Sequence, residues 1–278
     1  MSEMTDKSYV ERTFGLQDQV VALAGGGGTI ALALAEAFLE AGARVAIWSR
    51  RQETVDAALE QLGSDAGRRS RLCGVQADAG EEAAVDAALA ATVAALGAPT
   101  VLLNGVGGNR GKGAFNDIDV PLFEEVLRLN LVAGLVVPTK RTAAFWIARG
   151  SGGCIINVAS MASYVPLSGV WAYNAAKAGV VNLTMACAKE YAAHGIRVNA
   201  IAPGFIVANQ NRRLLIKDDA TGELTERGRQ IIDHTPFGRF ADAGEMTGAA
   251  LFLASEAAAG FITGVTIPID GGYLIDNV

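Results

Sequence analysis

The chain has 278 residues, of which 51% are hydrophobic and 19% charged, so it is long and apolar enough to bury one large core, in one domain or at most two. This composition excludes a disordered chain and a coiled coil. A formal charge of −6 leaves no basic surface for a phosphate backbone, so nucleic acid is not an expected partner. The mean hydropathy is +0.29, yet no run of about 18 uncharged apolar residues occurs, and we expect no membrane span.

The N-terminal residues, Met1–Lys7, are polar and acidic and lack the apolar core of a signal peptide, which predicts a cytoplasmic protein. Residues 1–16 are interpreted as an N-terminal extension. The three cysteines, Cys73, Cys154 and Cys187, do not have the spacing of metal ligands. We expect no metal site and interpret the cysteines as buried small hydrophobes.

Short β-branched runs alternate with longer helical patterns along the chain, as in repeated βαβ units. Strands are expected near Val20–Leu23, Arg44–Trp48, Leu72–Ala77, Thr100–Leu103, Cys154–Val158, Arg197–Ile201 and Val265–Ile269. Helices are expected near Ile30–Ala41, Glu53–Leu62, Glu81–Leu96, Pro121–Arg149, Trp171–His194 and Glu245–Leu253. The pattern predicts an α/β fold in which residues 1–278 form a single doubly wound Rossmann-type domain, with a seven-stranded parallel sheet and helices on both faces.

One segment does not fit this alternation. Residues 205–240 are polar, charged and too many for an ordinary connection between a strand and a helix. We interpret this segment as a substrate lid.

A glycine-rich stretch, Ala24–Ala31, follows the first expected strand and opens the first expected helix. Glycine permits the tight turn and close approach of a backbone to a pyrophosphate, and the N–H groups of the helix N-terminus point at the anion. The candidate dinucleotide-binding residues of this turn are Gly25, Gly27, Gly28, Thr29 and Ile30.

The end of the second strand bears on the choice between NAD and NADP. Folds that bind NAD usually place a carboxylate there to bind the ribose 2′-hydroxyl, but this chain has Ser49, Arg50 and Arg51. Ser49 and Arg50 are suited to a 2′-phosphate, which favours NADP over NAD. The alternative is that the two arginines are solvated residues at the start of a helix. This alternative stays open, and for Arg51 it is as good an explanation as cofactor binding.

A third group of residues predicts carbonyl chemistry. Tyr173 and Lys177 are four residues apart, which places both side chains on one face of a helix, and Ser160 follows the preceding strand. Reduction of a carbonyl creates an alkoxide that needs a proton donor and a hydrogen bond. A neighbouring ammonium favours the phenolate, so we expect Lys177 to lower the pKa of Tyr173 and Ser160 to hold the substrate oxygen.

These motifs occur in the order of the short-chain dehydrogenase/reductase family, which the chain resembles from about Gln17 to Tyr273. The resemblance implies that Tyr173 is the catalytic acid and base, that Lys177 binds the nicotinamide ribose and tunes Tyr173, that Ser160 polarises the carbonyl and that Asn130 holds a water of the proton relay. It also implies a homotetramer in which the Pro121–Arg149 and Trp171–His194 helices contact other subunits. Further cofactor contacts are implied at Asp78 and Ala79 on the adenine side, at Asn104, Gly105 and Val106 near the adenosine ribose, and at Pro203, Gly204 and Ile206 near the nicotinamide.

The glycine turn departs from the family pattern at Ala24, Thr29 and Ala31, and the segment after the Pro203-Gly204 pair departs from it at Ala208 and Asn209. Together with the stretches from Asn104 to Asn109 and from His234 to Phe240, the turn is similar to the subgroup of D-mannonate oxidoreductases and fructuronate reductases. This similarity implies a sugar-acid substrate. The carboxylate and hydroxyls of such a substrate need a cation and amide partners, and Asn109 and Arg212 are the leading candidates.

Two alternatives remain open at this point. The first is the same enzyme class acting on a cyclic, aromatic or 3-oxoacyl substrate, for which Trp171 and Leu167 would suit an apolar group. The second is a non-catalytic protein that binds the cofactor. An intact set of Ser160, Tyr173 and Lys177 argues against the second alternative.

Overall fold

Seven strands form one parallel sheet in the order β3-β2-β1-β4-β5-β6-β9. The structure is a computed structural model that describes residues 8–208 and 211–276. The central strands are buried along almost their whole length because helices cover both faces of the sheet. The strands are β1 (Val20–Ala24), β2 (Arg44–Ser49), β3 (Leu72–Gln76), β4 (Val101–Asn104), β5 (Gly153–Val158), β6 (Ile196–Pro203) and β9 (Thr266–Ile269).

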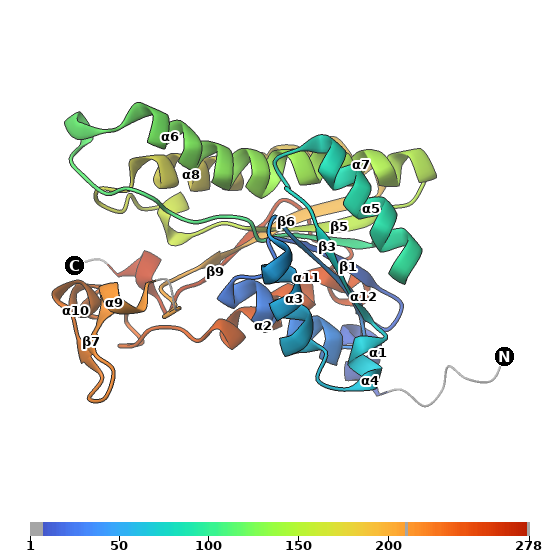
Figure 1. The fold of residues 1–278 in the computed structure, drawn as a ribbon, viewed down its shortest axis with the longest axis horizontal. Coiled ribbons are helices and arrows are strands. Elements are labelled where there is room, and N and C mark those ends of the chain that lie inside the picture. The colour runs from blue at the N-terminus through green and yellow to red at the C-terminus, as the bar shows by residue number, and fades with distance from the viewer. Residues whose placement is uncertain (1–7, 209–210, 277–278) are drawn as a thin grey trace.

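Helices cover the sheet in two layers, one on each face (Figure 1). One layer holds α5 (Glu82–Leu96), α6 (Val120–Leu127), the π-helix η2 (Arg128–Val136), α7 (Val137–Arg149) and α8 (Trp171–Tyr191). The other holds α2 (Thr29–Glu40), α3 (Gln52–Leu62), α11 (Thr247–Ala254) and α12 (Glu256–Ala259). Short helices lie at α1 (Tyr9–Phe14), α4 (Ala66–Arg69), η1 (Phe115–Asp117), η3 (Met161–Ser163), η4 (Ala192–His194), η5 (Ala243–Met246) and η6 (Tyr273–Ile275).

The core is divided by the sheet into two halves. Successive side chains of a strand point to opposite faces, so Val21 and Leu23 of β1 pack with α2 and α11, whereas Val20 and Ala22 pack with α5 and α7. β1 therefore contributes to both halves.

The sheet reverses its order of strand addition between β1 and β4. Ala24 and Asn104, the last residues of these two strands, are register partners, so the turns after β1 and β4 leave the sheet side by side. In open parallel sheets this point is where ligands bind. The two motifs that the sequence analysis assigned to the cofactor thus meet at one place.

The seven predicted strands are confirmed, with ends that shift by one or two residues. The predicted helix Pro121–Arg149 is continuous, but it contains the π-helix η2, which hydrophobic periodicity does not reveal.

The prediction for the cysteines is right for Cys154, which is buried, and wrong for Cys73 and Cys187, which are only half-buried. Both half-buried thiols lie at the edge of the core beside α5 and α8, where the packing is incomplete.

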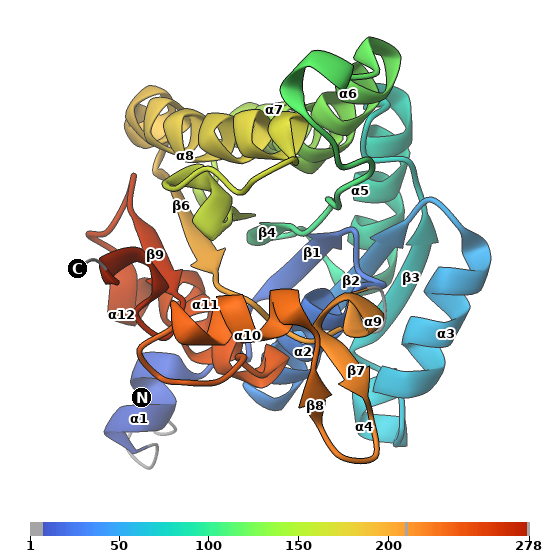
Figure 2. The ribbon, with the colours of Figure 1, turned by 90° about the vertical axis from the view of Figure 1, so that its left-hand side faces the viewer.

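The segment at 205–240 has structure of its own. It contains α9 (Arg212–Leu215), a hairpin of β7 (Ile216–Asp218) and β8 (Glu223–Leu224), and α10 (Glu226–Asp233). Figure 2 shows these elements on one side of the sheet edge, with α6 and α8 on the other.

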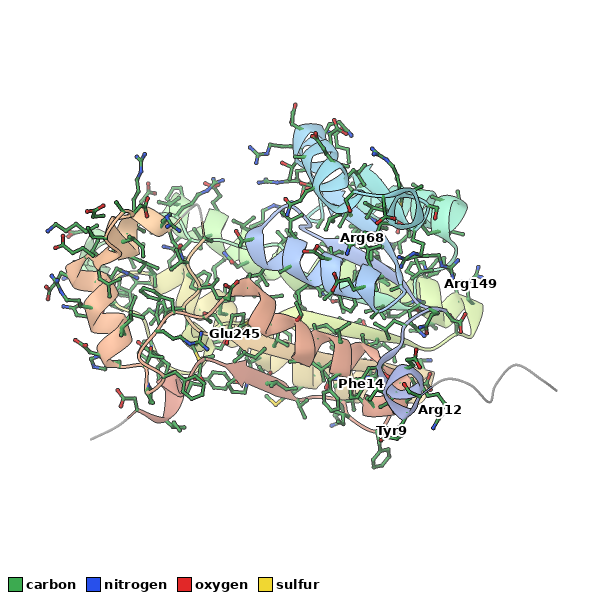
Figure 3. The ribbon with its side chains drawn as sticks, turned by 90° about the horizontal axis from the view of Figure 1, so that it is seen from below. Tyr9, Arg12, Phe14, Arg68, Arg149 and Glu245 are labelled. Atoms are coloured by element: carbon green, nitrogen blue, oxygen red, sulfur yellow. The ribbon has the colours of Figure 1, made fainter. Side chains whose placement is uncertain are left out.

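The predicted N-terminal extension is partly described. Residues 1–7 lie outside the described residues, and Ser8 caps α1. This short helix packs beside α12, where Ser255 Oγ donates a hydrogen bond to Thr13 O. Figure 3 labels Tyr9, Arg12 and Phe14 on it.

Among the described residues, no helix has both the length and the apolar character needed to cross a bilayer.

A buried polar ladder crosses the layer between the sheet and the helices α7 and α8. Asn104 donates to Thr139 Oγ1 at 2.9 Å and to Asn157 Oδ1 at 2.8 Å. Asn157 in turn donates to Thr184 Oγ1 at 2.9 Å. The ladder fixes β4 against β5 and ties both strands to α8, which carries Tyr173 and Lys177.

We predict that Thr184→Val lowers the free energy of unfolding by about 1–3 kcal/mol, because Asn157 Nδ2 is buried and loses its acceptor. Thr184→Ser keeps the hydroxyl and is expected to lose less than half as much. Urea denaturation of both variants measures the difference, and a Thr184→Val variant that is as stable as the wild type, beside a destabilised Thr184→Ser variant, would show that packing of the methyl group, not the ladder, stabilises this site.

Candidate active site

Tyr173 and Lys177 lie one helical turn apart near the start of α8, as the spacing predicts. Lys177 Nζ is 5.7 Å from the centroid of the Tyr173 ring. The helix packs against β5 and β6, so its first turns lie at the carboxyl edge of the sheet. The two side chains are therefore placed beside the turns that follow β1 and β4.

Lys177 is a buried cation. Its side chain is 4% exposed, and Nζ donates a hydrogen bond of 2.7 Å to Val158 O at the end of β5. Burial lowers the pKa of Lys177 to about 8. The ammonium is thus still mainly protonated at neutral pH and is held in one position by a backbone carbonyl.

Ser160 follows β5 and caps the short helix η3, where its Oγ accepts a hydrogen bond of 3.2 Å from Ala162 N. Burial raises the pKa of Tyr173, and a hydrogen bond with Ser160 lowers it in part. The net shift is therefore upward, because desolvation of the phenol outweighs the hydrogen bond with Ser160. The ammonium of Lys177 donates to Val158 O, and its expected lowering of the pKa of Tyr173 stays a prediction.

Asn130 is fully buried in the π-helix η2. Its Oδ1 accepts a hydrogen bond from Gly108 N at 2.9 Å, and its Nδ2 donates to Gly108 O at 2.7 Å and to Val126 O at 2.9 Å. Both amide N–H groups are used, so the side chain fixes the loop after β4. The predicted role in holding a water of the proton relay stays a prediction.

Gly107 lies where Asn130 and Lys177 meet. A methyl group on Gly107 would come within 2.8 Å of Asn130 Oδ1 and 3.4 Å of Lys177 Nζ. Glycine is therefore required here for steric reasons. Through it, the loop after β4 contacts both polar groups of the catalytic set.

The glycine-rich turn fits a pyrophosphate. Helix α2 begins after Gly28 with no side-chain cap and no acidic residue in its first turn, so its N-terminal N–H groups are available to an anion. A methyl group on Gly28 would meet nothing within 4 Å, which leaves space in front of the helix. Thr29 and Ile30 form the first turn, and Ala31, one of the departures from the family pattern, is buried in the core.

Gly25 explains why the two turns at the sheet edge can approach so closely. Its φ is +84°, and a methyl group on it would come within 2.6 Å of Val106 N. Gly25 N donates to Trp48 O and Gly105 N donates to Ala24 O, at 2.9 Å and 2.8 Å. A side chain at Gly25 would separate the turns that are predicted to hold the cofactor.

Residues predicted on the adenosine side lie around the ends of β2, β3 and β4. Ser49 ends β2, and Gln76 Nε2 donates to Arg50 O at 3.1 Å, which fixes the turn that presents the exposed Arg50 side chain. Asp78 Oδ1 accepts a hydrogen bond from Gly80 N, and Ala79 is buried. Asn104 has its Nδ2 engaged in the buried ladder, so the structure offers its backbone, not that amide nitrogen, to a ligand.

Residues predicted near the nicotinamide lie at the end of β6. Pro203 ends the strand, and a methyl group on Gly204 would come within 2.7 Å of Asp270 Cα. Ile206 is buried and forms a parallel bridge with Ala241. This region is thus closed by the chain that returns from 205–240.

The two leading substrate candidates are both exposed and both have protein partners. Asn109 Nδ2 donates to Gly111 O at 3.2 Å, and Arg212 Nε forms an ion pair of 2.7 Å with Asp219. Asn209, one of the departures from the family pattern, lies outside the described residues. The predicted contacts of Asn109 and Arg212 with substrate remain predictions.

The sequence analysis did not predict two contacts of the site and left the role of a third residue open. Val158 contributes a backbone carbonyl, which no residue type reveals. Gly108 is recognised only through its two hydrogen bonds to Asn130. For Arg51, the sequence left cofactor binding and a solvated position equally possible. In the structure it lines a cavity of about 530 Å³ with Gly27 and Thr54, between the glycine turn and α3.

A Rossmann-type sheet, an uncapped helix after a glycine turn, and the set of Ser160, Tyr173 and Lys177 define a dinucleotide-dependent oxidoreductase. Comparison with known proteins agrees. Residues 26–274 match the family model described as Enoyl-(Acyl carrier protein) reductase. The chain belongs to the short-chain dehydrogenase/reductase family and is an NAD(P)-dependent oxidoreductase.

Individual relatives cover nearly the whole chain. The oxidoreductase UxuB of Bacillus subtilis (strain 168), itself uncharacterized, is 34% identical over 273 residues, which are 93% of this chain and 96% of UxuB. A structure from Haemophilus influenzae, designated a D-mannonate oxidoreductase and containing bound NAD, has a TM-score of 0.85 and 31% identity and covers 95% of this chain and 97% of its own. A gluconate 5-dehydrogenase from Burkholderia cenocepacia J2315, in complex with NADP and tartrate, has a TM-score of 0.84 and 31% identity and covers 97% of this chain and 100% of its own.

The buried lysine predicts a pH dependence of stability. The folded-state pKa of Lys177, about 8, lies below its ordinary value of 10.5, so between these two pH values the unfolded chain binds more protons than the folded one. The free energy of unfolding should therefore rise with pH in this window, by up to about 1.4 kcal/mol per pH unit. Lys177→Met should lack this rise, as urea denaturation at pH 8, 9 and 10 would measure.

Lys189→Met is the control, because Lys189 is exposed on the same helix. It should retain the wild-type slope. If the wild type and Lys177→Met have parallel profiles, the ammonium is not desolvated as the structure indicates.

Proposed function

We propose that this protein interconverts a keto sugar acid and the corresponding hydroxy acid, of the fructuronate and mannonate type, by hydride transfer with NADP or NAD. The observation that carries the reaction class is the joint placement of Ser160, Tyr173 and Lys177 beside the glycine turn. The sugar-acid class is supported by relatives designated as acting on mannonate and gluconate, one of them with a hydroxy acid bound.

The chain's own residues supply the proton chemistry. The bound nicotinamide supplies or accepts the hydride. In reduction, Tyr173 donates its proton to the carbonyl oxygen as that oxygen gains negative charge. Ser160 accepts its hydrogen bond from Ala162 N, which leaves the hydroxyl proton for the same oxygen.

Lys177 stabilises the phenolate that remains after Tyr173 has given up its proton. The raised pKa of Tyr173 keeps the phenol protonated before reduction, which suits a proton donor. In oxidation the same residue must act as a base, and the nearby ammonium makes this less costly. The segment 205–240 serves as the lid that excludes water over the site.

We favour NADP as the cofactor. No carboxylate stands at the end of β2 or in the three residues that follow it, and Arg50 projects from a turn held by Gln76. Arg51 adds a second guanidinium on the side of the glycine turn, at the cavity shared with Gly27 and Thr54. Two arginines at this place complement the extra negative charge of a 2′-phosphate.

The contacts of Trp171 argue against the alternative that the site binds an apolar substrate. Its indole Nε1 donates to Gly113 O at 3.1 Å, and its ring packs edge-on against Phe115 with centroids 5.4 Å apart. Trp171 therefore holds the loop after β4. Part of its aromatic surface is therefore already in contact with the protein.

We predict that the purified protein reduces D-fructuronate, and faster with NADPH than with NADH. Tyr173→Phe should lower kcat about 10²- to 10⁴-fold because it removes the proton donor while keeping the ring. Nicotinamide absorbance, followed with both cofactors in parallel, measures this. Cofactor binding without turnover of D-fructuronate, D-mannonate or D-gluconate would contradict the sugar-acid proposal, and full activity of Tyr173→Phe would contradict the mechanism.

We also propose a homotetramer. Val136, Ile147 and Met185 expose apolar side chains on η2, α7 and α8, and Phe261 and Ile275 do so near the C-terminal edge. Sedimentation equilibrium at micromolar concentration should give the mass of four 28.8 kDa chains. Met185→Glu together with Ile147→Glu should shift the distribution to smaller species, and a wild-type monomer would exclude this assembly.

A further inference from the structure

The loop that follows β4 crosses the catalytic end of α8. We define residues 108–115 as the strap. It begins at Gly108, which Asn130 holds, and ends at Phe115, which packs on Trp171. Trp171 is the first residue of α8, and Tyr173 is the third.

The first half of the strap is anchored to α6. Arg110 forms an ion pair with Glu125, and a methyl group on Gly111 would come within 2.8 Å of Leu122 Cδ2. Asn109 Nδ2 donates to Gly111 O within the strap itself. These contacts use the polar side chains that precede Lys112.

The second half is anchored to the start of α8. Gly113 N donates to Gly169 O at 3.3 Å, and Gly113 O accepts from the Trp171 indole at 3.1 Å. The segment that contains Gly169 is fixed in turn by Asn174, whose side chain bonds both the N–H and the carbonyl of Leu167. Lys112 therefore lies between two fixed halves of the strap.

The stem of Lys112 lies over Gly169. A methyl group on Gly169, whose φ is +78°, would come within 2.9 Å of Lys112 Cγ and 3.3 Å of Lys112 Cε. The methylene chain thus packs on the backbone four residues before Tyr173, while the residue as a whole remains exposed. A packed stem loses less freedom when its ammonium binds a ligand than a fully solvated lysine does.

The charge of Lys112 is available. Within residues 8–208 and 211–276, no carboxylate oxygen lies within 4.0 Å of its Nζ, whereas Arg110 and Arg212 are paired with Glu125 and Asp219. An ammonium beside the reacting end of the site would attract an anionic group of a substrate. Its flanking glycines leave no side chain beside it in the sequence.

We propose that Lys112 binds the carboxylate of the substrate and so makes the site prefer sugar acids over neutral polyols. This inference rests on the proposed function and assigns to Lys112 a role that the sequence analysis gave to Asn109 and Arg212. A sugar acid carries its carboxylate away from the hydroxyl that is oxidised, so one residue contacts the carboxylate while Ser160 and Tyr173 contact the reacting oxygen. Lys112 sets specificity and takes no part in proton transfer.

The test compares acids with neutral molecules of the same carbon skeleton: D-gluconate with D-glucitol, and D-mannonate with D-mannitol. Lys112→Met should raise KM for the acids about 10-fold, with kcat changed less than 2-fold, and leave kcat/KM for the polyols unchanged. Lys112→Arg should keep KM for the acids within about 3-fold of wild type. The fall of kcat/KM for the acids with rising NaCl should be shallower in Lys112→Met.

The matched control is Lys189→Met, another exposed lysine on α8, which lies 18 residues beyond Trp171, or about 27 Å at 1.5 Å per residue. It should behave as wild type in every assay, and thermal melting of all variants verifies the fold. Turnover of an acid by the wild type with an unchanged KM in Lys112→Met, or an equal rise for acids and polyols, would overturn the role of Lys112 alone. Wild-type turnover of polyols but of no acid would overturn the proposed function, and the role of Lys112 with it.

Discussion

The burial of one ammonium group constrains most of the site. Lys177 is almost fully enclosed, and a buried cation is stable only where polar groups face it. The carbonyl of Val158 provides one partner, and Asn130 Oδ1 lies across Gly107 from the ammonium. The end of β5, the π-helix η2 and the loop after β4 must therefore all lie within a few ångströms of α8.

This constraint explains features that look unrelated in the sequence. Gly107 has no side chain because the space beside it belongs to Asn130 and Lys177. The ladder from Asn104 through Asn157 to Thr184 fixes the strands on which α8 lies. Gly25 then lets the phosphate turn approach the same loop from β1. The catalytic and cofactor ends of the site are thus connected through one loop, and its position depends on small residues.

Sequence patterns were sufficient for the sheet and for the placement of Tyr173 and Lys177 on one helix. β-Branched runs specify the strands because a doubly covered sheet needs them, and a spacing of four places Tyr173 and Lys177 on one helix face by geometry alone. The features that the sequence did not reveal depend on contacts with residues elsewhere in the chain. Val158 acts through its backbone, and burial raises the pKa of Tyr173.

Charge pairing is another feature that the sequence pattern did not reveal. Arg212 and Lys112 look alike in the sequence as loop cations, and the pattern favoured Arg212. The structure shows that Arg212 is bound to Asp219, Lys217 to Glu223 and Arg239 to Glu245, so these cations of the segment 205–240 are matched by carboxylates of the same segment or the helix that follows it. Such exposed pairs add little to stability, but each neutralises a charge that a substrate could otherwise use.

In the strap, one of the two cations is paired with a carboxylate and the other is not. Arg110 is neutralised by Glu125, which belongs to α6, and the glycines on both sides of Lys112 carry no side chain that could compete for its ammonium. The ammonium of Lys112 therefore lies on the fixed strap, whereas Arg212 of the segment 205–240 is paired with Asp219. If Lys112 holds the carboxylate as proposed, the substrate stays in register with Ser160 and Tyr173 independently of the segment 205–240, so the proposed lid would need only to exclude water and not to position the substrate.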